Sequence, residues 1–196
     1  MKCEIREERI DVLPEYERIP IAFDVLSILE VQIIDQGLSG MLFSERRLSE
    51  SFVKDYDALE KCRPTSWAGR WDISKWGLLS AFFEGQRVGG CVIAFGIESN
   101  FEQNGPELWD VRVLPEFRKK GIGSLLFDAA VEWAEAREWK YLRIETQNIN
   151  VGACRFYAKL GCELWSIDRF AYPEFPDEIK LIWRKALKKA PEKSPS

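Results

Sequence analysis

Residues Leu108–Arg137 read LWDVRVLPEFRKKGIGSLLFDAAVEWAEAR and divide into a strand, a basic turn and a helix. Leu108–Leu114 alternates in hydrophobicity and is rich in residues that favour β-structure, so it predicts a strand that stops at Pro115. The turn RKKGIG then opens a helix with one apolar face. The predicted apolar face consists of Ile122, Leu125, Leu126, Ala129, Ala130 and Trp133, with Asp128, Glu132 and Glu135 turned outward.

This order of elements predicts an anion site at the start of the helix. The first helical turn has unpaired N–H groups and the positive end of the helix dipole, and nearby glycines let a phosphate approach the backbone closely. Three basic residues add fixed charge, and arginine can bind phosphate with two hydrogen bonds. A basic turn that only caps the helix is the alternative. The residues expected to hold a pyrophosphate are Arg118, Lys119, Lys120, Gly121, Ile122, Gly123 and Ser124.

Two other phosphate-binding loops fit the same turn poorly. A Walker A loop ends in GK[ST], which this turn lacks. A dinucleotide loop needs a third glycine where this chain has Leu126.

Length and composition indicate one soluble globular domain. The chain has 196 residues, of which 46% are hydrophobic and 31% charged. We expect the domain to cover residues 1–187 and the tail at residues 188–196 to be disordered. No apolar run approaches the ~20 residues of a membrane span, and the N-terminus lacks the apolar segment of a secretory signal.

Cysteine usage and charge narrow the functional classes. The five cysteines are odd in number and form no C-x-x-C pair, which argues against a disulfide framework or a zinc site and favours a reducing cytoplasm. The net charge of −4 argues against a broad nucleic-acid surface and suits a cationic substrate.

Two unusual counts limit the chemistry. The chain has no histidine, so acid–base chemistry must use carboxylates, tyrosine, lysine, cysteine or water. It also has eight tryptophans, with Trp67, Trp71 and Trp76 close together in sequence. We expect these three to pack in the core, and an aromatic wall for an amine or cation is the alternative.

The N-terminal half predicts strands and a hairpin. Lys2–Ile10 is expected to be a short strand, and Ala22–Ile34 favours a strand although its apolar spacing is mixed. A polar, irregular stretch is expected between Pro14 and Pro20, a helix at Leu48–Leu59 capped by Ser49 or Ser51, and a loop at Cys62–Ser66. Trp76–Phe83 and Val88–Phe95 flank a short glycine-containing turn and predict a hairpin, followed by a loop at Ser99–Pro106.

The C-terminal half continues the sheet. Tyr141–Thr146 predicts a strand parallel to Leu108–Leu114, reached through the helix. Asn150 is a good cap for a helix with Ala153, Phe156, Tyr157 and Leu160 on one face, and Gly161 is a good residue to end it. Cys162–Ile167 and Ile179–Trp183 predict two further strands. The expected fold is α/β (α+β), with a mixed, mostly antiparallel central sheet, one splayed parallel strand pair and flanking helices.

A second motif, together with the first, indicates a family. Residues 145–162 read ETQNINVGACRFYAKLGC, and the turn at residues 118–123 has the pattern R-x-x-G-x-G. The chain resembles the GNAT superfamily of N-acetyltransferases, whose signatures are this acetyl-CoA loop and N-x-x-A-x-x-F-Y-x-x-x-G-F. Cys162 stands where that pattern has Phe. The resemblance covers roughly residues 76–183 and implies the GNAT fold and acetyl-CoA as co-substrate.

A finer resemblance concerns one group within the superfamily. The runs LRIETQN, AC-x-FYAKLG and IDRFAY are similar to those of the streptothricin acetyltransferases, which acetylate an amine of an antibiotic. This likeness implies a small cationic amine as substrate and does not fix its identity.

The resemblance implies an acetyl transfer in which an ammonium must first lose a proton. Tyr157 matches the GNAT tyrosine that donates a proton to the departing sulfur. Glu145 resembles the proton acceptor of ribosomal-protein N-terminal acetyltransferases, and Asp110 occupies a strand where several GNAT enzymes have an acidic residue. Either carboxylate could instead be structural, and strand alternation allows Asp110 to form a plain ion pair with Arg112.

The resemblance also assigns the remaining cofactor contacts. Backbone N–H groups of Val111, Arg112 and Val113 are expected to hold the pantetheine arm and polarise the thioester carbonyl. Asn150 is expected to bind the pantetheine or the backbone, with simple helix capping as the alternative. An acetyl-cysteine on Cys154 or Cys162 is disfavoured because no histidine is present to activate a thiol, so direct transfer in a ternary complex is expected.

Three functions remain open at this point. The first is a small-molecule amine acetyltransferase, and the second acts on a protein N-terminus or lysine. The third is a CoA-binding module without turnover. We expect no metal, nucleic-acid or membrane partner, and the superfamily leaves a homodimer open.

Overall fold

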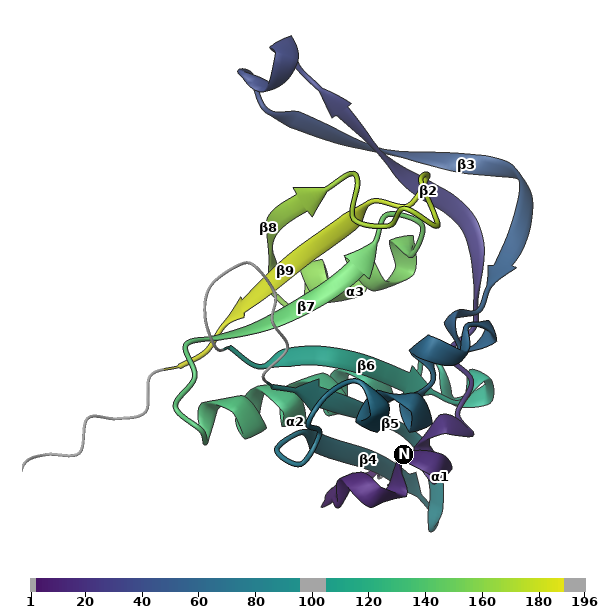
Figure 1. The fold of residues 1–196 in the computed structure, drawn as a ribbon, viewed down its shortest axis with the longest axis vertical. Coiled ribbons are helices and arrows are strands. Elements are labelled where there is room, and N and C mark those ends of the chain that lie inside the picture. The colour runs from purple at the N-terminus through teal and green to yellow at the C-terminus, as the bar shows by residue number, and fades with distance from the viewer. Residues whose placement is uncertain (1–2, 96–104, 189–196) are drawn as a thin grey trace, which may run out of the picture. The chain divides into compact units, whose positions relative to one another are not determined.

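A computed structural model describes residues 3–95 and 105–188 of the chain (Figure 1). Most of the loop predicted at Ser99–Pro106 and nearly all of the predicted tail lie outside the described residues. The fold groups into two compact units. The first unit comprises Met1–Ile21, Asp55–Ile144 and Arg184–Ser196, and the second comprises Ala22–Lys54 and Glu145–Trp183. The single domain expected for residues 1–187 stays a prediction.

The strand, turn and helix of the opening stretch form as predicted. Strand β6 spans Glu107–Val113, a short 3-10 turn spans Pro115–Phe117, and helix α2 spans Ile122–Glu135. The helix buries Ile122, Leu126, Ala130 and Trp133 of the predicted apolar face. Leu125 was expected on that face, but its side chain is 43% exposed. Phe127 and Ala134 are buried instead, because the buried stripe is rotated toward the following positions.

The predicted mixed sheet is confirmed, with strand order β1-β4-β5-β6-β7-β9-β8. Strands β1, β4, β5 and β6 pair antiparallel in succession. Strand β7 pairs parallel with β6, where Glu107 is opposite Arg143 and Leu108 is opposite Ile144. The remaining strands of this sheet are β1 (Glu4–Glu8), β4 (Gly77–Phe83), β5 (Gln86–Ala94), β7 (Tyr141–Gln147), β8 (Glu163–Asp168) and β9 (Lys180–Ala186).

The helix predicted at Leu48–Leu59 is wrong. Residues Met41–Lys54 form strand β3, which pairs antiparallel with β2 at Phe23–Ile33 and makes the long two-stranded ribbon seen in Figure 1. A 3-10 turn at Tyr56–Ala58 follows it. Serines at 49 and 51 can cap a helix but also suit an extended strand, so cross-strand pairing with β2 decides the structure. The strand predicted at Ala22–Ile34 is confirmed by β2.

Short helical segments replace two stretches that were expected to be irregular. Helix α1 spans Leu13–Glu17, after a 3-10 turn at Ile10–Val12, and it has Pro14 in its first turn, where proline is tolerated. Two 3-10 turns, Glu60–Cys62 and Pro64–Gly69, occupy the loop predicted around Cys62–Ser66. A further 3-10 turn at Asp35–Gly37 lies between β2 and β3.

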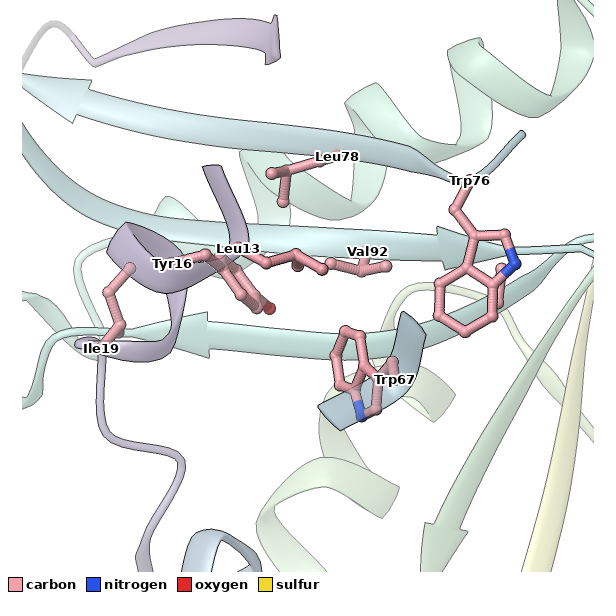
Figure 2. Close-up of a cluster of buried hydrophobic side chains, with 8 residues drawn as sticks. Leu13, Tyr16, Ile19, Trp67, Trp76, Leu78 and Val92 are labelled. Carbon is pink, nitrogen blue, oxygen red and sulfur yellow. The ribbon is translucent and has the colours of Figure 1, made fainter. Parts of the chain in front are cut away.

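The tryptophans predicted to pack in the core form part of one hydrophobic cluster in the first unit (Figure 2). Trp67 and Trp76 are 2% and 6% exposed, and their ring centroids are 5.8 Å apart. Trp71 and Trp109 pack against them with ring centroids 5.1 Å apart. The buried members of the cluster are Leu13, Tyr16, Ile19, Trp67, Trp76, Leu78, Val92 and Ala94.

Two adjacent glycines on β5 let elements approach the sheet closely from both faces. A Cβ on Gly90 would come within 2.8 Å of the Tyr16 ring on α1. A Cβ on Gly89 would come within 2.9 Å of the Arg112 carbonyl and 3.3 Å of Ile122 on α2. Because neighbouring strand residues point to opposite faces, the pair Gly89-Gly90 accommodates both neighbours at once.

Helix α3 of the second unit spans Val151–Lys159 and confirms both predicted end signals. The Asn150 side chain accepts a hydrogen bond of 3.0 Å from the N–H of Ala153. Gly161 adopts a left-handed φ of 73° just after the helix, as a C-terminal glycine should. The predicted strands at Cys162–Ile167 and Ile179–Trp183 correspond to β8 and β9.

Candidate functional site

The turn that leads into α2 has the geometry of an anion site. Gly121 is the N-cap residue, with a left-handed φ of 88°, and Lys119 also has a positive φ of 60°. Among the described residues no side-chain cap is present at this end of α2, and its first turn has no acidic residue. A Cβ on Gly121 would meet no atom within 4 Å. The first N–H groups of α2 are therefore suited to an anionic ligand.

The three basic residues of the turn differ in what they contact. Arg118 donates from Nε to the Val113 carbonyl at 3.0 Å and from Nη2 to the Pro20 carbonyl at 2.9 Å. These bonds fix the turn to the end of β6 and to the segment after α1. Lys119 and Lys120 are exposed, and the Lys120 Nζ lies 5.2 Å from the Phe117 ring. The lysines are thus the more accessible positive charges near the helix end.

Strand β6 buries some side chains of its last residues and leaves others partly exposed. Its residues Val111 and Val113 are partly exposed, whereas Arg112 between them is 1% exposed. One backbone edge of this segment pairs with β5, where Val111 is opposite Cys91 and Val113 is opposite Gly89. Within the described residues, registered pairing with β7 stops at Leu108. The segment Val111–Val113 therefore has a strand edge that is suited to a linear ligand.

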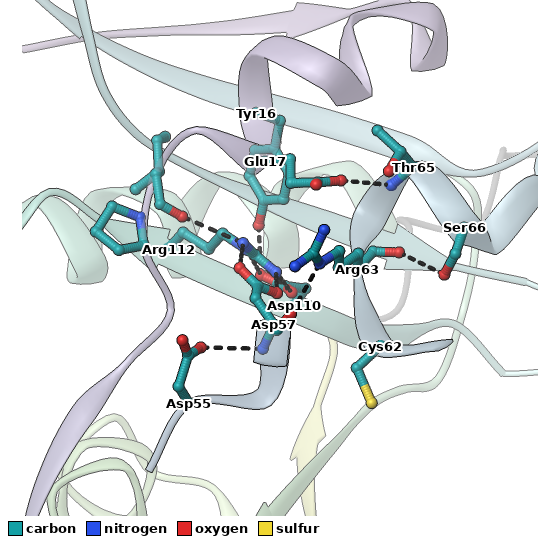
Figure 3. Close-up of polar contacts among 12 residues, drawn as sticks. Tyr16, Glu17, Asp55, Asp57, Cys62, Arg63, Thr65, Ser66, Asp110 and Arg112 are labelled. Atoms are coloured by element: carbon teal, nitrogen blue, oxygen red, sulfur yellow. Dashed lines mark hydrogen bonds and ion pairs between the residues drawn. The ribbon is translucent and has the colours of Figure 1, made fainter. Parts of the chain in front are cut away.

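Asp110 and Arg112, which the sequence placed on one strand face, form the centre of a buried polar network (Figure 3). Tyr16 donates its hydroxyl proton to Asp110 Oδ1 at 2.6 Å. Arg112 donates from Nε to Asp110 at 3.0 Å and from Nη1 and Nη2 to Asp57 at 2.6 and 2.9 Å. It also donates to the carbonyl of Ile19 at 3.2 Å. The plain ion pair considered for Asp110 is what the structure contains.

Burial and charge set the protonation of this network. Burial by itself would lower the pKa of Arg112, but Asp110 and Asp57 more than offset it and raise that pKa. Burial, and then the charge of Asp110, raise the pKa of Tyr16 well above its usual value. Arg112 therefore stays charged and Tyr16 stays a hydrogen-bond donor at neutral pH.

In the second unit, Tyr157 lies on α3 and is 7% exposed. Its ring packs edge-on against Phe156, with centroids 5.1 Å apart. The backbone carbonyl of Tyr157 accepts a hydrogen bond from Cys162 at 3.0 Å, which closes the end of the helix. Helix capping by Asn150 and closure at Gly161 together fix the position of this tyrosine within the unit.

Glu145, the other candidate base, belongs to a polar cluster on β7 that the sequence did not predict. Tyr172 donates its hydroxyl proton to Glu145 Oε1 at 2.7 Å, and Gln147 donates to the Tyr172 hydroxyl oxygen at 3.0 Å. The Lys180 Nζ lies 3.6 Å from Glu145 Oε2. The side chain of Glu145 is 28% exposed, so solvent or a ligand can reach it. Strand alternation places Glu145 and Gln147 on one face, which was the available signal.

A second missed residue is Asn148, which is 3% exposed at the end of β7. Its side chain donates to the Leu29 carbonyl at 3.1 Å and accepts from the Ile179 N–H at 2.8 Å. Its backbone also bonds both residues, with distances of 3.0 Å. Asn148 thus joins β2 to the segment before β9, a role that no sequence pattern indicated.

The cysteines are free, and three of them are buried. Burial raises the pKa of the Cys154 thiol, which lies 3.5 Å from the Thr146 hydroxyl. Cys154 is therefore protonated at neutral pH and a poor nucleophile.

The described residues contain neither a helix suited to a membrane nor a cluster suited to a metal ion. None of the helices there is long and apolar enough to cross a membrane. Residues 3–95 and 105–188 also contain no group of three or more Cys, Asp or Glu side chains arranged to hold a metal ion.

The family model and the similar proteins described below are all acetyltransferases. The model of the Acetyltransferase (GNAT) family matches residues 45–162. Streptothricin acetyltransferase A of Bacillus subtilis (strain 168) is 40% identical over 96 residues, which are 47% of this chain and 54% of that protein. The match thus spans only about half of that relative's length. A streptothricin acetyltransferase of Escherichia coli is 29% identical over 89% of this chain and 94% of its own.

Solved structures show the same fold. One is a protein assigned as a streptothricin acetyltransferase from Bacillus anthracis str. Ames, in complex with acetyl coenzyme A. It has a TM-score of 0.75 and 23% identity, and the match covers 95% of this chain and all of the other. A nourseothricin acetyltransferase has the same TM-score with 19% identity, over 96% of this chain and 100% of its own.

Proposed function

Because the chain belongs to the GNAT acetyltransferase family, we propose that it transfers an acetyl group from acetyl-CoA to a primary amine. The proposed acceptor is a small cationic molecule of the streptothricin type. The observation that carries this proposal is the uncapped, acid-free N-terminus of α2 behind the basic turn at residues 118–120. The names of the relatives with 40% and 29% identity support the choice of acceptor.

The residues of the turn fit the pyrophosphate of CoA. The N–H groups of Ile122, Gly123 and Ser124 in the first turn of α2 would bind phosphate oxygens, and Gly121 leaves room for them because it has no side chain. The exposed side chains of Lys119 and Lys120 would add positive charge. Arg118 would act mainly by fixing the turn, since two of its donors bond backbone carbonyls.

The thioester is assigned to the backbone of Val111–Val113. A strand edge offers N–H groups at regular spacing, which suits an amide-containing arm and a carbonyl that becomes negatively charged. The hydrogen bonds of the buried Arg112 would hold this segment in place. We accordingly assign Asp110 a structural role, because Tyr16 and Arg112 occupy its carboxylate.

Proton transfer is assigned to two residues of the second unit. Glu145, which is partly exposed, would accept a proton from the ammonium directly or through water. Tyr157 would donate a proton to the sulfur as it leaves. Direct transfer is proposed because the buried Cys154 stays protonated. Asn150 is assigned to capping α3, the contact it makes in the structure.

The setting of the reaction is also proposed. A net charge of −4 favours a cationic acceptor over nucleic acid. Free cysteines support a reducing cytoplasm as the compartment. A homodimer stays a prediction.

The test is an acceptor panel in which free-thiol release from acetyl-CoA is followed with streptothricin, a polyamine and a lysine-containing peptide. We expect turnover with streptothricin and little with the peptide. Turnover with the peptide alone would instead assign the chain to protein acetylation. Acetyl-CoA binding without turnover on any amine would favour a CoA-binding module.

A further inference from the structure

We propose that Tyr172 is a positioning residue that holds the carboxylate of Glu145 for proton transfer. The inference rests on the proposed function, in which Glu145 accepts the proton. It concerns a hydrogen-bonded chain of three side chains in the second unit, in which Gln147 donates to Tyr172 and Tyr172 donates to Glu145. Neither the strand pattern nor the family motifs predicted this role for Tyr172.

The direction of the chain follows from the donors available. The amide nitrogen of Gln147 can only donate, so the Tyr172 oxygen is the acceptor of that bond at 3.0 Å. The proton of the phenol is then directed to Glu145 Oε1, at 2.7 Å. A carboxylate oxygen accepts this bond, so the phenol fixes the position of Glu145 Oε1.

The segment that carries Tyr172 is itself anchored within the unit. It lies between β8 and β9, and the N–H of Phe175 donates to the Tyr172 carbonyl at 2.9 Å. Glu178, further along the same segment, pairs with Lys54 at the end of β3, and both side chains are largely buried, with 9% and 12% exposed. Lys54 also stacks on the Phe175 ring, with Nζ 3.6 Å from its centroid. These contacts hold in place the loop that carries Tyr172.

Lys180 forms an ion pair with the other carboxylate oxygen of Glu145. Its Nζ is 3.6 Å from Glu145 Oε2, which is longer than a hydrogen bond. The phenol hydrogen bond and this ion pair thus each act on one carboxylate oxygen. Tyr172 would thus fix the orientation of the Glu145 carboxylate for proton transfer.

The test compares four proteins with one acceptor amine on which the wild type turns over: wild type, Tyr172→Phe, Glu145→Gln and the double variant. Tyr172→Phe keeps the ring and removes only the hydroxyl. We expect it to lower kcat about tenfold or more and to leave the KM for acetyl-CoA unchanged, because one charge-assisted hydrogen bond is lost. The double variant should be no slower than Glu145→Gln alone, because Tyr172 acts through Glu145.

A matched control and a second variant keep the result interpretable. Tyr141 lies at the exposed start of β7, so Tyr141→Phe should keep the wild-type rate. If Tyr172→Phe does not fold, Gln147→Leu removes the donor behind the phenol and should lower kcat in the same direction. Wild-type kcat in Tyr172→Phe, or a full additional loss in the double variant, would overturn the proposal for Tyr172 alone. A wild type that is inactive on every amine would instead overturn the proposed function, and this proposal with it.

Discussion

Arg112 illustrates how one buried side chain can depend on partners that are distant in sequence. Its guanidinium pairs with Asp110 on its own strand and with Asp57, 55 residues away. Tyr16, whose hydroxyl donates a hydrogen bond to Asp110, is 94 residues away from Asp110 in the sequence. Strand alternation allowed the local pair with Asp110 as an alternative to a catalytic role. Neither Asp57 nor Tyr16 could be predicted, because only the tertiary fold brings them to β6.

The network makes Arg112 a strong determinant of stability. Arg112→Met removes the positive charge and leaves the largely buried carboxylate of Asp110, 8% exposed, without its cationic partner. We expect a loss of about 3–5 kcal/mol in the free energy of unfolding, as for other broken buried ion pairs. Urea unfolding monitored by tryptophan fluorescence measures it.

The control for this variant is a pair with the same sequence spacing on the surface. Arg9 and Asp11 form an ion pair with side chains 87% and 60% exposed. Arg9→Met should leave the urea midpoint unchanged, since solvent screens such pairs. An equal loss in the free energy of unfolding for both arginine variants would show that the buried network stabilises the protein no more than the surface pair does.

At the scale of elements, the ends of α3 were readable from sequence and the nature of β3 was not. Asn150 and Gly161 impose local backbone geometry, so their effect needs no tertiary contact. Residues 48–54 carry a pattern that suits either a helix or a strand. Their partner β2 decides between them, and its pairing register could not be known from this segment alone.

The cap of α3 gives a direct prediction at this scale. Asn150→Ala removes the acceptor for the Ala153 N–H and should destabilise the protein by about 1 kcal/mol. Asn150→Asp keeps an acceptor and should retain most of the stability. Thermal unfolding of both variants measures the difference. A wild-type melting temperature in Asn150→Ala would mean that the cap contributes nothing.

At the scale of the whole molecule, stability should fall in alkali because buried thiol and phenol groups hold their protons more tightly when folded. Burial raises the pKa of Cys91 and of Tyr16 above the ordinary values of about 8.5 and 10. Above those values the unfolded chain loses protons that the folded chain keeps. Each group therefore lowers the free energy of unfolding by about 1.4 kcal/mol per pH unit, until its folded pKa is reached.

Urea unfolding between about pH 8 and 11 tests this sign. The Cys91→Ala variant should lose part of the slope that begins at about pH 8.5, to which the buried Cys154 thiol also contributes, and keep the part that begins at about pH 10. A free energy of unfolding that is constant over this range, or equal slopes in both proteins, would contradict the assignment.

The family was readable from the sequence because its signatures are short, contiguous motifs. The two compact units were not, because two of the four points at which the chain passes between them lie inside the continuous strands β7 and β9. The cluster around Glu145 was missed for a related reason. Tyr172 is 27 residues from Glu145, on a segment without regular secondary structure.

The most direct test of the account is the rate of free-thiol release from acetyl-CoA with an amine acceptor, in wild type and in Tyr157→Phe. We predict turnover by the wild type and a loss of tenfold or more in kcat for the variant, with little change in the KM for acetyl-CoA, because only the proton donor is removed. Wild-type kcat in Tyr157→Phe would contradict the assignment of the acid. Failure of the wild type on every amine would contradict the proposed acetyl transfer itself.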